Sequence, residues 1–184
     1  MRTCLALFAI VVFGISDSLQ AAATMPVVTA AVNNYAGVGT DVLAEAERET
    51  SRIFQHAGVR VTWVDPLVNR TTVRVHILSA SMTVRTGARP EVVGLATVQS
   101  GMVYVLYDRV LDKSEALNVR IARVLGFVMA HEIGHVLLAG RGHGHVGVMK
   151  PRLDSDVLRT GLIGFTREEG REMRVTISSG DHAP

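Results

Sequence analysis

Cysteine and lysine are nearly absent from this sequence. Cys4 is its only cysteine, and Lys113 and Lys150 are its only lysines among 19 basic residues. A chain with one cysteine cannot form an internal disulfide, so burial must provide most of its stability. The arginines are scattered, the net charge is only +2, and no basic patch is interleaved with aromatic residues. We therefore expect no nucleic acid among its partners.

Long hydrophobic runs are also scarce. The run from Leu5 to Ile15 is too short for a good membrane span. Arg2 precedes it and the small residues 21–23 follow it, a pattern typical of a secretory signal peptide. We expect residues 1–23 to be removed and the mature protein to be secreted or periplasmic, without a stable membrane anchor. Residues 24–177 then form one domain, and residues 178–184 a disordered tail.

Hydrophobic periodicity predicts an α+β domain. Alternating apolar residues indicate strands over residues 26–33, 59–64, 71–78, 92–98 and 102–107. Helical spacing predicts a helix after Thr40 as N-cap, a long helix over residues 115–138, and a last helix over residues 167–175 that begins with a capping box of Thr166 and Glu169. Residues 79–90 read as a polar loop.

The long apolar helix contains the segment His131-Glu132-Ile133-Gly134-His135. Residues four apart share a helix face, so His131 and His135 can bind one Zn²⁺ ion through their imidazoles. Zinc lowers the pKa of a bound water, and Glu132 can accept the proton of that water. Two histidines and a glutamate without a partner would be costly to bury in so apolar a helix, which favours the metal interpretation over chance.

A catalytic zinc needs three protein ligands and one open position. The glycine-rich segment after the helix offers His143 and His145, and its glycines allow the chain to turn back. We rank His143 first, because it is the first histidine after the helix, and keep His145 as a ligand or a neighbour of the site. Acidic residues of the last helix remain a third source, although we expect them on a solvated helix face: Glu168, Glu169 and Glu172.

This combination of HEIGH, a glycine stop, a later histidine and Met149 resembles the metzincin branch of the zincin metallopeptidases. The resemblance covers residues 26–149 and implies a mixed, mostly parallel twisted sheet of about five strands on a long backing helix and a buried active-site helix. It implies zinc ligands at His131 and His135, a water-activating Glu132, and Met149 beneath the metal. Residues 94–97 (Gly94, Leu95, Ala96 and Thr97) would form the edge strand that pairs with a peptide substrate.

The sequence also departs from the metzincin signature HExxHxxGxxH. Leu138 stands at its glycine and Arg141 at its third histidine, while Gly140 and His143 each come two residues late. We therefore infer a divergent, compact metzincin-like protein.

These patterns predict a zinc metallopeptidase, with an endopeptidase favoured, that acts on a peptide or protein through one catalytic Zn²⁺. The alternative is a binding protein that keeps the zincin scaffold with a structural or inactive zinc site, in which Glu132 has no purpose. A lysostaphin-like peptidase using His143 and His145 as a strand pair is a further alternative, but residues 140–145 make a poor strand because three of them are glycine.

Overall fold

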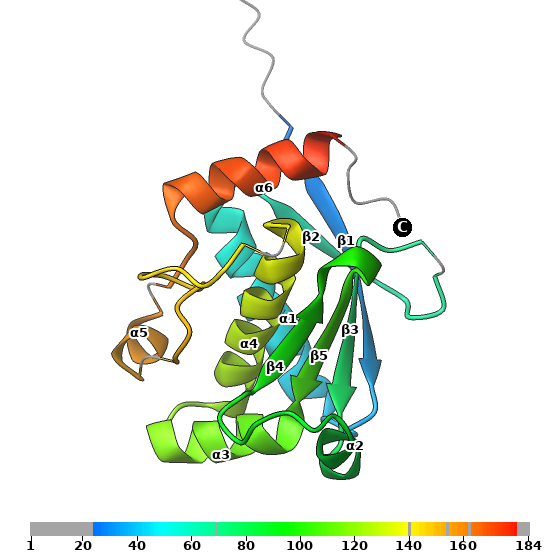
Figure 1. Cartoon of the computed structure of the whole chain (residues 1–184), viewed down its shortest axis with the longest axis vertical. Helices are drawn as coiled ribbons and strands as arrows, with labels where there is room; N and C mark the ends of the chain where they lie inside the picture. The colour runs from blue at the N-terminus through cyan, green and yellow to red at the C-terminus, as the bar shows by residue number, and fades with distance from the viewer. Residues whose placement is uncertain (1–23, 69, 140, 154, 162, 180–184) are drawn as a thin grey trace, which may run out of the picture.

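A computed structural model of the chain describes residues 24–68, 70–139, 141–153, 155–161 and 163–179 (Figure 1). The expected signal peptide and residues 180–184 of the expected tail lie outside these ranges. Among the described helices, none has both the length and the apolar character that a membrane crossing requires.

A five-stranded sheet forms one layer of the molecule. Its strands lie in the order β2 (Arg60–Val64), β1 (Val27–Asn34), β3 (Val73–Leu78), β5 (Met102–Leu106) and β4 (Gly94–Thr97). Neighbouring strands are parallel except for β4, which pairs antiparallel with β5 at one edge. The alternation seen in the sequence has its expected cause, because Val73, Val75 and Ile77 of β3 are fully buried. The predicted mixed, mostly parallel sheet is confirmed.

Two long helices pack together against one face of this sheet: α1 (Thr40–His56) and α4 (Ile121–Leu137) (Figure 1). They touch closely at Gly126, where an added Cβ atom would lie 2.7 Å from the carbonyl oxygen of Ala46. Across the same contact, the Thr50 hydroxyl donates to the Gly126 carbonyl at 3.0 Å. Helix α4 is buried around nearly its whole circumference, so it is the central helix of the domain.

The single helix predicted over residues 115–138 is wrong, because two helices occupy this region. Helix α3 runs from Tyr107 to Leu117 and α4 begins at Ile121. Asn118 ends α3 with a φ of 50°, a left-handed conformation that asparagine tolerates better than most residues. Ser114, which lies inside α3, donates its hydroxyl to the Val119 carbonyl and stabilises this break.

Smaller differences concern the polar segments. The predicted loop over residues 79–90 contains a short helix, α2 (Ala80–Arg85), and α1 has Gly39 rather than Thr40 as its N-cap. The last helix, α6 (Arg167–Ser179), begins with the predicted capping box. It includes Ser178 and Ser179, which belong to the predicted tail, and the Ser179 hydroxyl donates to the Thr176 carbonyl within the last turn of the helix. A short helix, α5 (Ser155–Thr160), precedes it.

Candidate metal centre and active site

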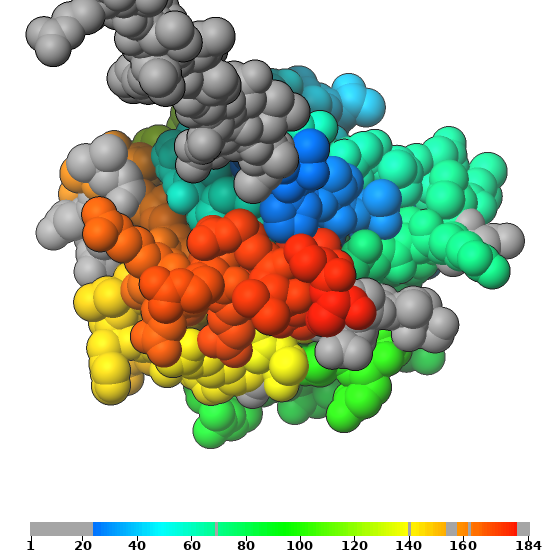
Figure 2. All heavy atoms as spheres, turned by 90° about the horizontal axis from the view of Figure 1, so that it is seen from above, coloured from blue at the N-terminus to red at the C-terminus, as the bar shows by residue number. Residues whose placement is uncertain are grey.

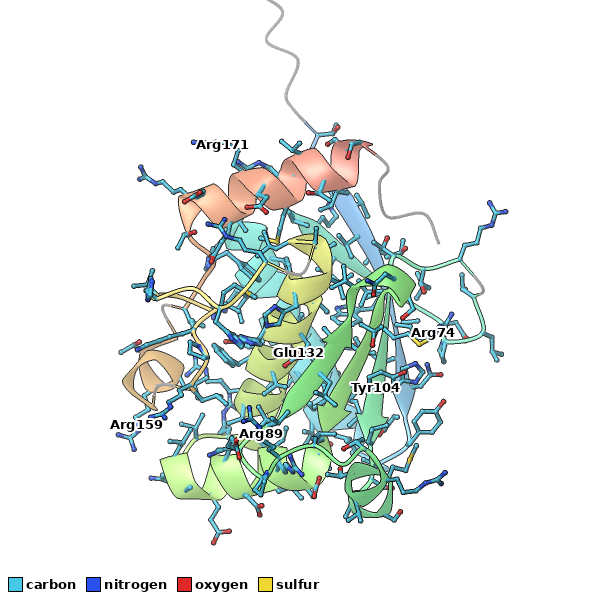
Figure 3. The ribbon with its side chains drawn as sticks, in the orientation of Figure 1. Arg74, Arg89, Tyr104, Glu132, Arg159 and Arg171 are labelled. Atoms are coloured by element: carbon cyan, nitrogen blue, oxygen red, sulfur yellow. The ribbon has the colours of Figure 1, made fainter. Side chains whose placement is uncertain are left out.

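Helix α4 brings the HEIGH residues to the middle of the domain. His131 and Glu132 are buried, with 9% and 5% of their surface exposed, and His135 is half-buried. Glu132 lies on the side of α4 that faces the edge strand β4 (Figure 3). One helix therefore supplies two imidazoles and a carboxyl group to the same region, as its periodicity predicted.

In both histidines of α4, the Nδ1 atom faces a backbone carbonyl oxygen. His131 Nδ1 lies 2.7 Å from the Val148 carbonyl oxygen, and His135 Nδ1 lies 3.3 Å from that of Arg141. A carbonyl oxygen only accepts hydrogen bonds, so each Nδ1 carries the proton. In the neutral rings the two Nε2 atoms are then unprotonated, and their lone pairs are free to bind a metal.

Those two Nε2 atoms lie 3.2 Å apart. Because neither carries a hydrogen, two lone pairs would face each other at this distance without a stabilising interaction. Two imidazole nitrogens bound to one tetrahedral zinc lie about 3.3 Å apart, given Zn–N distances of about 2.0–2.1 Å. The arrangement of His131 and His135 therefore fits a shared cation.

His143 is the third member of the cluster. One ligand atom from each of His131, His135 and His143 can be chosen so that all lie within 4.8 Å of one another. The His143 ring stands 5.2 Å from that of His131 and 4.9 Å from that of His135, measured between centroids. His143 is exposed and lies between Gly142 and Gly144, so its side chain has room to adjust around an ion.

The other candidates for the third ligand lie elsewhere. His145 is exposed and lines a separate small hollow with Val146 and Arg152. Glu168 and Glu172 form ion pairs with Arg141. Glu169 is buried in the capping box with Thr166, so our expectation of a solvated face was wrong for this residue. Within the described residues, the only group of metal-binding side chains is the histidine triplet.

Burial changes the acid–base properties of the site. Burial, helped by the neighbouring His135 and His143, lowers the pKa of His131 to about 4, although the hydrogen bond with the Val148 carbonyl acts in the opposite direction. It also lowers the pKa of His135. Both rings are therefore neutral at neutral pH, which is the form that binds metals. Burial raises the pKa of Glu132 to about 8. A cation beside this carboxyl group would favour its ionised form.

Met149 supports the site from within the core. It is fully buried, and its Sδ atom lies 2.7 Å from the position of a Cβ atom on Gly134. A side chain at position 134, which lies between His131 and His135 in the sequence, would collide with Met149 and with the ring of Phe165. Glycine allows both to approach α4 closely at this point. A glycine inside an apolar helix is a sign of close packing, and the sequence predicts that Gly134 packs against the sheet. In the structure its close contacts are Met149 and Phe165 instead. Nothing in the sequence pointed to the carbonyl of Val148 as the partner of His131.

A cleft of about 360 Å³ opens beside the histidines and Glu132. The segment before β4 forms one wall and α4 forms the floor with Phe127 and Val128, both buried. The chain that follows Met149 forms the other wall with Lys150, Pro151 and Leu153. Arg89, in the segment before β4, and Glu132, on α4, both line this cleft (Figure 3). The cleft is large enough for a side chain of a bound molecule beside the histidine cluster.

The edge strand borders the same cleft. The Leu106 N–H donates to the Val93 carbonyl at 3.0 Å, and the strand register pairs Gly94 with Val105 and Ala96 with Val103. Hydrogen-bonded and non-hydrogen-bonded pairs alternate in an antiparallel ladder, so Gly94 and Ala96 belong to non-hydrogen-bonded pairs. Their backbone N–H and C=O groups therefore point away from β5, toward the open edge.

A search of protein-family profiles finds no match to this sequence, and a search of curated proteins finds none either. Among solved structures, the chain is similar to archaemetzincin from Methanopyrus kandleri, with a TM-score of 0.58. The two sequences are 13% identical, and the alignment covers 82% of this chain and 96% of that chain. At this identity the likeness concerns the fold, which is metzincin-like.

Proposed function

We propose that this chain is a zinc-dependent peptidase in which Glu132 is the general base. The observation that carries the proposal is the pair of unprotonated Nε2 atoms, 3.2 Å apart, beside a third histidine and a buried carboxyl group. The similarity of the fold to that of archaemetzincin supports the same proposal.

His131, His135 and His143 would hold a single zinc ion and leave one position open. Zinc bound there would supply a Lewis acid that polarises a carbonyl group and acidifies a water molecule. The Val148 and Arg141 carbonyl groups keep His131 and His135 in the tautomer that exposes Nε2.

Glu132 would move the proton. Its carboxylate accepts a proton from the attacking water and then donates it to the nitrogen of the leaving amine. Glu132 is buried against β4, which would keep bulk water away from its carboxyl group, so the proton would be transferred within the cleft. A structural zinc site has no use for such a group, which favours the enzyme over a binding protein with the same scaffold.

The substrate would be a peptide or protein segment in extended form. The outward N–H and C=O groups of Gly94 and Ala96 can pair with its backbone, while the cleft receives one side chain. Binding along a strand edge uses residues on both sides of the scissile bond, so we favour an endopeptidase. We further propose that residues 1–23 direct the chain to secretion or the periplasm, that residues 24–177 contain the catalytic unit, and that nucleic acid is not a partner.

Three variants of the mature chain test the function. Glu132→Gln keeps the shape of the side chain but removes the base, so zinc content should persist while hydrolysis of a broad peptide library falls roughly 10²- to 10⁴-fold. His143→Ala should lose zinc, and His145→Ala should retain both zinc and activity, because His145 lies outside the cluster. Zinc would be measured by atomic absorption on the purified proteins.

The alternatives give different results in the same experiment. Full hydrolysis by Glu132→Gln would rule out this mechanism. A protein that binds zinc but cleaves no peptide would be the zincin-fold binding protein. Loss of zinc from His145→Ala with its retention by His143→Ala would reverse the ligand assignment.

A further inference from the structure

The third histidine lies on a segment with little support of its own. His143 is exposed and stands between two glycines, and glycine loses more backbone entropy on ordering than any other residue. His131 and His135, in contrast, are fixed by α4. A ligand on such a segment binds a metal well only if other contacts hold the backbone in place.

Contacts on both sides of His143 provide this restraint. One residue after it, the Gly144 N–H donates to the Met149 carbonyl at 2.8 Å. Two residues before it, the Arg141 N–H donates to the Leu138 carbonyl at 2.9 Å, and the Arg141 carbonyl faces His135 Nδ1 at 3.3 Å. Arg141 therefore contacts His135 through its carbonyl group and lies two residues before His143 in the chain.

The side chain of Arg141 reaches the last helix. Its Nη1 lies 2.7 Å from Glu172 Oε2 and its Nη2 lies 3.5 Å from Glu168 Oε1. The two glutamates are four residues apart, so they share one face of α6. Seen from above, α6 lies directly beside the segment that follows α4 (Figure 2). Glu168 and Glu172, which lie 27 and 31 positions after Arg141 in the sequence, thus contact the segment that carries the third histidine.

Helix α6 is itself well fixed. Met173 is fully buried, and the Arg174 guanidinium donates to the Ala57 carbonyl after α1. Gly170 packs near the same carbonyl, where an added Cβ atom would lie 3.0 Å away. At the start of the helix, the buried Glu169 closes the capping box and lies near Gly144. These contacts make α6 a rigid support for the Arg141 side chain.

We propose that Arg141 is a positioning residue for the metal: its paired contact with Glu168 and Glu172 holds His143 where it can complete the zinc site. This inference rests on the proposed function, because it requires zinc at the three histidines. It assigns α6 a part in metal binding, although α6 supplies no ligand. It also gives a purpose to the residue that stands where the metzincin signature has its third histidine.

For Arg141, electrostatic repulsion alone predicts the opposite change in zinc affinity. A guanidinium near a dication repels it, so removing the charge of Arg141 should tighten zinc binding if no positioning is involved. Removing the carboxylates of Glu168 and Glu172 should weaken it. Positioning instead predicts that both changes weaken zinc binding, and that they do not add, because each removes the same contact.

The experiment measures zinc affinity by competition with a chromophoric chelator, using the whole mature chain. We expect Arg141→Gln and the pair Glu168→Gln/Glu172→Gln each to weaken zinc binding roughly 5- to 10-fold, through faster dissociation. The triple variant should show no further loss. Arg171→Gln is the matched control, since it removes one positive charge from an exposed site on α6 (Figure 3).

A second readout separates positioning from general instability. The visible spectrum of the Co²⁺-substituted protein reports the coordination geometry, and it should shift in Arg141→Gln but not in Arg171→Gln. The melting temperature of the metal-free variants should stay within about a degree or two of the parent, because exposed ion pairs contribute little to stability. Wild-type zinc affinity in Arg141→Gln, tighter binding, or additive losses would each overturn the proposal. Absence of zinc binding by the parent chain would instead contradict the proposed function.

Discussion

The backbone of Gly94 in the edge strand lies directly against the carboxyl group of Glu132 in α4. A Cβ atom added to Gly94 would stand 2.6 Å from Oε1, 2.7 Å from Cγ and 2.8 Å from Cδ of that glutamate. The strand that would bind the substrate backbone and the residue that would move the proton therefore touch each other. In the proposed function, their contact would fix the distance between substrate and base.

This contact predicts the effect of Gly94→Ala. The new methyl group overlaps most of the Glu132 side chain, so the carboxyl group has to move by about an ångström. Misplacement of this size can cost up to about 10²-fold in rate, and we expect turnover to fall roughly 10- to 100-fold. Zinc content should not change, because no ligand is displaced. Thr97→Ala, exposed on the same strand, should leave turnover intact, and an equal loss in that variant would contradict the argument.

Ala96→Pro tests the outward edge of β4. Proline removes the N–H of residue 96, which points away from β5, so the ladder within the sheet is spared. The loss of one backbone hydrogen bond, about 1 kcal/mol, should raise KM for an extended peptide roughly 5- to 10-fold with little change in kcat or zinc content. Ala96→Gly keeps the N–H and serves as the control. Unchanged KM in the proline variant would place the substrate on another edge.

Metal removal should destabilise the mature chain. An ion that binds only the folded state adds about 3–4 kcal/mol at 100 to 1,000 times its Kd. We expect a chelator to lower the Tm by roughly 6–15 °C in differential scanning calorimetry, and added zinc to restore it. His143→Ala is the control, since its Tm should respond much less. If metal analysis verifies that the zinc has been removed and the Tm nevertheless stays constant, the folded protein does not depend on a bound metal.

The metal-free protein should show a pH dependence that originates from Glu132. Burial raises its pKa from 4.5 to about 8, so the folded state binds this proton more tightly than the unfolded chain does. The resulting stability is fully present below about pH 4.5 and is lost as the pH rises through about 8.

Glu132→Gln isolates this contribution, because all other titrating groups are common to both proteins. Between pH 4.5 and pH 8, the free energy of unfolding of the variant should rise relative to the metal-free parent by roughly 3–5 kcal/mol. Urea denaturation in the presence of a chelator measures the difference. A difference that does not vary with pH would mean that the carboxyl group is solvated in the folded protein.

The sequence by itself determined the features that depend on local periodicity. His131 and His135 share a helix face at any place in the fold, because the helical repeat alone puts them there. The alternation of Val73, Val75 and Ile77 predicted a strand with one buried face, and the pairing of Thr166 with Glu169 predicted the start of α6. In each case the partners lie within a few residues of one another, so spacing carries the information.

Only the tertiary structure decided which residues meet across the chain. The break between α3 and α4 depends on the left-handed conformation of Asn118. The residues around Asn118 have a strongly helical pattern of hydrophobicity, so the pattern alone does not show this break. The sequence ranked His143 before His145 only by its order in the chain, because a glycine-rich segment has no periodicity that directs its side chains; the structure brings His143 beside His131 and His135. The carbonyl that orients His131 comes from Val148, and Glu132 meets Gly94 through the packing of α4 on the edge strand. These contacts join residues far apart in sequence, and their geometry follows from the packing of whole elements rather than from any local pattern.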